Sequence, residues 1–69
     1  METLDASLVR MLNQIAQNFG YLPPGEAAAE TANHLRQFWT PEMLEHLAEH
    51  LEAGGGDLSP VALEAARLL

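Results

Sequence analysis

The chain has 69 residues, no cysteine, three basic and ten acidic residues, and a formal net charge of −7. This charge opposes binding to nucleic-acid phosphates and anionic membrane surfaces, and the lack of cysteine excludes iron–sulfur ligation, disulfides and thiol nucleophiles. The N-terminus lacks the features of a signal peptide, and no apolar run approaches the roughly 18 residues of a membrane span. We therefore expect a cytoplasmic protein with no nucleic-acid or membrane partner.

The length predicts a single helical domain over residues 1–69, near the lower limit for independent folding. Eleven of the hydrophobic residues are alanine, which bury little area each. The core is therefore expected to be only marginally stable, and docking on a partner would add what it lacks.

The first predicted helix runs from about Ala6 to Phe19, with Asp5 as its N-cap and Gly20 as a left-handed residue after its end. Its apolar stripe at helical spacing consists of Leu8, Met11, Leu12, Ile15 and Phe19. The opposite polar face, with only one charge, consists of Arg10, Asn13, Gln14, Gln17 and Asn18. Amides cost less to bury than charges, so this face is a candidate interface, with an ordinary solvated face as the alternative.

The second predicted helix runs from about Glu26 to Phe38, after a Pro23–Pro24 turn. Its apolar face consists of Ala28, Ala32, Leu35 and Trp39. Neighbouring helical residues point about 100° apart, so one of the rings of Phe38 and Trp39 is expected in the core and the other toward a groove or partner. Burial of both rings within the chain is the alternative. An aromatic residue near Arg36 is typical of a binding hot spot.

The third predicted helix begins at Pro41, with Thr40 as N-cap and with Trp39 and Leu44 at the spacing of a hydrophobic staple. Its apolar face consists of Met43, Leu44, Leu47, Ala48 and Leu51. Its acidic stripe, expected to be solvated or to meet a basic partner surface, consists of Glu42, Glu45, Glu49 and Glu52.

Three glycines, residues 54–56, predict a flexible exit from the third helix. The fourth helix is expected from Pro60 to about Leu68, with Ser59 as N-cap and Leu58 and Leu63 as a second staple. Its apolar residues are Val61, Ala62, Ala65, Leu68 and Leu69. No segment alternates like a strand, so the sequence predicts an all-α fold, a small three- to four-helix bundle with short loops.

Two short motifs invite a chemical interpretation that the chain does not support. His46 and His50, in an H-x-x-E-H pattern, are spaced to share a metal ion, but a catalytic site needs a third ligand and a cleft that 69 residues scarcely provide. Adventitious metal binding by this pair stays open. Asp57-Leu58-Ser59 differs in order from the attachment motif of acyl carrier proteins, and proline follows it. We predict no catalytic, cofactor-binding or metal-binding residue.

Three segments together resemble a known family. They are Arg10–Phe19 with an M-x-N-Q-I pattern, His34–Met43 with H-L-R-x-F-W-x-P-x-M, and Gly54–Pro60 with a glycine run before L-x-P. In this order and spacing they resemble the delta subunit of cytosolic NAD-dependent, molybdenum-containing formate dehydrogenases, over nearly the whole chain. One departure is that Glu42 and Glu45 stand where the family usually carries basic residues.

The resemblance implies a non-catalytic accessory subunit that docks on the large catalytic subunit and supports its assembly, cofactor loading or stability. It places molybdenum bis-pterin, iron–sulfur clusters, FMN and NAD in partner subunits and none in this chain. The candidate interface consists of Arg10, Asn13, Gln14, Gln17, His34, Arg36, Phe38 and Trp39. A free-standing helical interaction or regulatory module that self-associates is the alternative.

Overall fold

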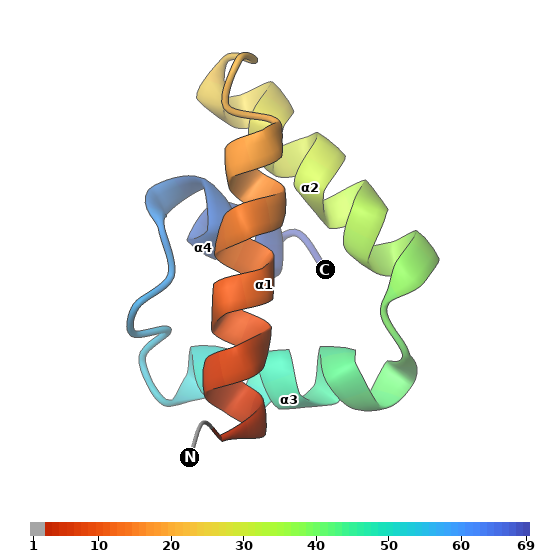
Figure 1. Ribbon diagram of the computed structural model, residues 1–69, viewed down its shortest axis with the longest axis vertical. Coiled ribbons are helices and arrows are strands. Elements are labelled where there is room, and N and C mark those ends of the chain that lie inside the picture. The colour runs from red at the N-terminus through yellow and green to blue at the C-terminus, as the bar shows by residue number, and fades with distance from the viewer. Residues whose placement is uncertain (1–2) are drawn as a thin grey trace.

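The computed structural model describes residues 3–69, which form four α-helices and no strand. The helices are α1 (Leu4–Asn18), α2 (Pro24–Phe38), α3 (Pro41–Glu52) and α4 (Pro60–Arg67). Helix α1 crosses the front of the molecule, α3 lies across one end, and α2 diverges from α1 toward its own C-terminus (Figure 1). The predicted all-α bundle is confirmed, with four helices.

The starts of α3 and α4 follow from local sequence. Thr40 Oγ1 accepts a hydrogen bond from the amide of Met43, and Ser59 Oγ accepts one from the amide of Ala62, both at 3.2 Å. Proline occupies the first position of each helix, where its missing N–H has no intrahelical partner to lose. Both N-caps were predicted, and both are confirmed.

The first two helices begin two residues earlier than predicted. Thr3, not Asp5, caps α1, because its Oγ1 accepts a bond of 3.1 Å from the amide of Ala6. Asp5 lies in the first turn, where a negative charge still interacts favourably with the helix dipole. Helix α2 begins at Pro24, not Glu26, since proline suits the first helical position and Pro23 caps it without a side-chain bond.

The end of α1 also differs from expectation. Gly20 is not left-handed: among the described residues, positive φ angles occur only at Gly54, Gly55 and Asp57. Helix α1 ends instead with a tight turn in which the amide of Gly20 donates to the carbonyl of Gln17 at 3.0 Å. A tight final turn of this kind satisfies terminal carbonyls without a left-handed residue.

Helix α3 ends in a Schellman motif, so its glycine exit is an ordered turn rather than a loose linker. The amide of Gly55 donates to the carbonyl of His50 at 2.9 Å, and the amide of Gly54 donates to that of Leu51 at 3.0 Å. Gly55 is buried, and a Cβ there would lie 2.9 Å from a methyl carbon of Leu63. This turn directs the chain toward α4.

Helices α2 and α4 make the most extensive contact in the bundle. A cluster of small buried residues, Ala28, Ala32 and Ala65, lies between them, with Val61 packed against it. Small side chains let two helix backbones approach closely, and close approach maximises dispersion contacts over a limited area. The alanines therefore form a specific helix–helix contact.

A second cluster joins all four helices around Trp39, which is 7% exposed. Its other buried members are Leu8, Leu12, Ala16, Leu35, Leu47, Ala62 and Ala66. Phe38, in contrast, is 67% exposed. Of the two adjacent rings, Trp39 is therefore the one in the core. The predicted apolar face of α2 is confirmed, since all four of its members are buried.

The predicted apolar faces of the other helices need correction. On α1 the buried arc includes Val9 and Ala16, while Met11 is 41% exposed, because α1 packs against both α3 and α4. Ala48, Leu68 and Leu69 were also expected to face the core and are exposed. Ala48 and Leu69 line an open hollow between α3 and α4, and Leu68 and Leu69 follow the end of α4.

We expect Trp39→Ala to lower the free energy of unfolding by about 3–5 kcal/mol, because it opens a cavity where the helices meet. A loss of that size removes much of the stability of a small domain. Phe38→Ala should change the free energy of unfolding by less than about 1 kcal/mol. Urea titration followed by far-UV circular dichroism compares the two variants, and equal losses would contradict this assignment of the rings.

Candidate partner interface

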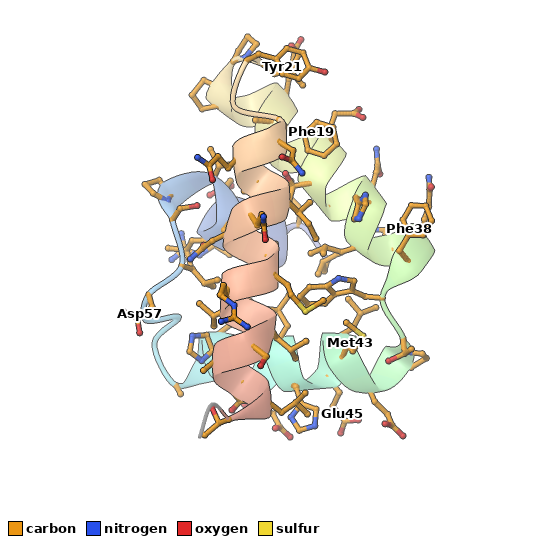
Figure 2. The ribbon with its side chains drawn as sticks, viewed as in Figure 1. Phe19, Tyr21, Phe38, Met43, Glu45 and Asp57 are labelled. Atoms are coloured by element: carbon orange, nitrogen blue, oxygen red, sulfur yellow. The ribbon has the colours of Figure 1, made fainter. Side chains whose placement is uncertain are left out.

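Acidic residues are distributed unevenly over the molecule. None of the ten lies between residues 6 and 25, and Arg10 is the only charged residue in that stretch. The four glutamates of the acidic stripe of α3 are all exposed, and Figure 2 shows Glu45 pointing away from the bundle. The surface therefore has an acidic end at α3 and a nearly uncharged face along α1.

The outward face of α1 carries most of the polar residues that the sequence singled out. Its exposed members are Arg10, Met11, Gln14, Gln17 and Asn18. Glutamine and asparagine amides there can exchange hydrogen bonds with a partner without desolvating a full charge. We name these five residues the α1 face.

Asn13, by contrast, is occupied within the chain. Its side-chain nitrogen donates to the carbonyl of Asp57 at 2.8 Å, and its side-chain oxygen accepts from the amide of Ser59, also at 2.8 Å. These bonds hold the loop before α4 against α1, at the point where Asp57 adopts a left-handed φ of 67°. Asn13 is thus a structural latch between α1 and the start of α4.

The two histidines of α3 have different neighbours. His50 Nε2 lies 2.7 Å from the carbonyl oxygen of Gly56, in the same loop that Asn13 holds. His46 Nδ1 lies 3.4 Å from a carboxylate oxygen of Asp5 and 3.8 Å from one of Glu49. Over residues 3–69, no group of three or more histidine or acidic side chains is placed to hold a metal ion.

The predicted site residues at the end of α2 separate into outward and inward ones. The rings of His34 and Phe38 form a tilted pair with centroids 4.7 Å apart, and Phe38 lies on the outer side of the helix (Figure 2). Arg36 donates to the carbonyl of Leu68 at 2.6 Å and to the side chain of Asn33 at 3.1 Å. The buried Trp39 and the engaged Arg36 therefore serve the fold, and Phe38 is an exposed aromatic residue.

The structure adds a shallow hollow between α1 and the start of α4 that the sequence did not reveal. No charged side chain lines it; its residues are Asn13, Ala16, Gln17, Gly20, Ser59, Pro60 and Val61. The two sides of the hollow are far apart in the chain and are joined by the Asn13 latch and by the packing of α1 against α4. No sequence pattern signals that juxtaposition.

These features define a class of protein, a small all-α bundle with a nearly uncharged face along α1 and an acidic end at α3. A profile of the FdsD family, the delta subunit of NADH-dependent formate dehydrogenase, matches residues 7–66, and the chain belongs to this family. The resemblance that the sequence motifs indicated is therefore confirmed.

No curated protein and no solved structure matches the chain. Within the described residues, no helix is long and apolar enough to cross a bilayer.

We expect Asn13→Ala to lower the free energy of unfolding by about 1–3 kcal/mol, since it removes two hydrogen bonds and leaves two loop backbone groups without their partner. Asn18→Ala is the matched control, because Asn18 lies exposed on the same helix and makes no side-chain hydrogen bond among the described residues. The control should change stability by no more than about 0.5 kcal/mol. Thermal unfolding measures both variants, and equal stabilities would contradict the latch.

Proposed function

We propose that this chain is a non-catalytic accessory subunit of a cytoplasmic formate dehydrogenase complex, which docks on the large molybdenum subunit and supports its assembly, cofactor loading or stability. The family match over residues 7–66 carries this proposal. In it, molybdenum bis-pterin, iron–sulfur clusters, FMN and NAD belong to the partner subunits, and this chain binds none of them.

The surface supports a binding role through two elements, the α1 face and the end of α2. The α1 face offers amides and Met11 with a single charge, and the end of α2 offers the His34–Phe38 ring pair. An exposed aromatic side chain already held by a neighbouring ring loses little rotamer freedom on binding, which favours its use as an anchor. Of the sequence-predicted interface, Arg10, Gln14, Gln17, His34 and Phe38 thus remain as proposed partner contacts.

Phe38→Ala should reduce the amount of this chain that co-purifies with a tagged large subunit by at least about tenfold, as expected for an aromatic hot spot. The matched control is Tyr21→Ala, because Tyr21 is 80% exposed at the α1–α2 turn, away from Phe38 (Figure 2). Tyr21→Ala should co-purify like the unmodified chain, and thermal unfolding should be unchanged in both variants. Loss of co-purification in both, or in neither, would contradict Phe38 as the anchor.

The role in the complex is tested by producing the dehydrogenase with and without this chain. We expect the enzyme made without it to contain less molybdenum per large subunit or to dissociate faster, and so to lose formate-oxidising activity. Equal metal content, stability and activity would contradict an accessory role. A chain that never associates with the dehydrogenase but sediments as a dimer would instead support the self-associating module, to which the same exposed apolar residues point.

A further inference from the structure

The acid-free stretch, residues 6–25, contributes two adjoining parts of the surface along α1. It supplies the α1 face and, through Ala16, Gln17 and Gly20, one side of the uncharged hollow. Ser59, Pro60 and Val61 supply the other side. The remaining chain carries ten acidic residues and two arginines, so all of the net negative charge lies outside this surface.

The polar groups of Asn13 and Ser59 at the hollow are already satisfied, and the side-chain amide of Gln17 is exposed at its edge. Ser59 N donates to Asn13 Oδ1, and Ser59 Oγ accepts from the amide of Ala62. Ala16 is buried, and the aliphatic side chain of Val61 is half-buried. An uncharged surface could therefore cover the hollow if it offers a hydrogen-bond partner to the Gln17 amide, since unpaired polar atoms are the main cost of burying such a site.

We propose that the occupant of this surface is an uncharged face of another formate dehydrogenase subunit, apolar over the hollow and with hydrogen-bond partners for the exposed amides, and that the acidic stripe of α3 stays in water. The inference rests on the proposed function and adds the chemistry of the partner surface. A basic partner surface would be attracted to α3, and an acidic one would be repelled by a chain of charge −7. An uncharged surface meets no carboxylate and a single arginine along residues 6–25.

Charge insertion at a matched pair of glutamines tests the proposal. Gln17 and Gln37 are both exposed, and each is the last residue but one of a 15-residue helix, so a new carboxylate meets the same end of the helix dipole in both. Gln17→Glu should weaken binding to the formate dehydrogenase complex purified from cells lacking this chain by at least about tenfold, because the carboxylate would be buried without a partner. Gln37→Glu should bind like the unmodified chain.

Gln14→Glu, on the same face, is a second variant, and thermal unfolding identifies any variant that fails to fold. We expect Gln14→Glu to weaken binding to the formate dehydrogenase complex as well. Similar affinity of Gln17→Glu, Gln14→Glu and the unmodified chain would overturn the proposal. Biolayer interferometry on the immobilised complex measures the Kd of each variant.

Ionic strength distinguishes the uncharged surface from a basic one. Between about 50 mM and about 500 mM salt, the Kd of the unmodified chain should change by less than about threefold, because screening acts on exposed charges. The double variant Glu45→Gln with Glu52→Gln should bind unchanged. A steep loss of affinity in salt, or in this variant, would overturn the inference while leaving the proposed function intact.

Two further results separate the possible failures. A chain that binds the dehydrogenase in none of these forms would contradict the proposed function and this inference together. Sedimentation tests whether a second copy of the chain is the occupant. The proposal would be overturned in favour of a dimer if the chain self-associates, if Gln17→Glu abolishes this self-association, and if the chain does not bind the complex. Two chains of charge −7 repel each other, so we expect the isolated chain to sediment as a monomer.

Discussion

Close packing of α2 against α4 is the constraint on which the rest of the structure depends. Their contact is built from alanine, which contributes little area, so it stabilises the bundle only if the helix backbones approach closely and in one register. Helix α4 has only eight residues and cannot find that register through its own length. The chain before it must therefore be held in place, and the Schellman turn, His50 and the Asn13 latch all act on that segment.

Features set by neighbouring residues were predictable from sequence, and features set by distant ones were not. Thr40 and Ser59 were recognised as N-caps because cap, proline and first turn are contiguous. The cap of α1 was misplaced because Thr3 and Asp5 are both good caps, and nothing local separates them. The partners of Asn13 lie 44 and 46 residues away, so its side chain looked like part of an exposed polar face.

The residues that carry the family resemblance divide between fold and surface. Asn13, Arg36 and Trp39 all belong to the recognisable segments, and all three make contacts within the chain. These segments therefore specify the bundle at least as strongly as they specify a partner. This explains why sequence patterns could identify the family and the helices yet mark only part of the candidate interface. Exposure, which separates Phe38 from Trp39, depends on how α2 and α3 meet.

The acidic composition has a physical role that follows from the limited core. A bundle this small leaves large apolar side chains on its surface, among them Met11 and Phe38, and such residues favour non-specific association. A net charge of −7 opposes the approach of a second copy or of any acidic protein, over a distance of about 10 Å at ordinary salt. Because the acids avoid residues 6–25, this repulsion does not prevent contact along α1. Negative charge thus restricts which surfaces can approach, and the nearly uncharged face along α1 is where the chain's own carboxylates oppose contact least.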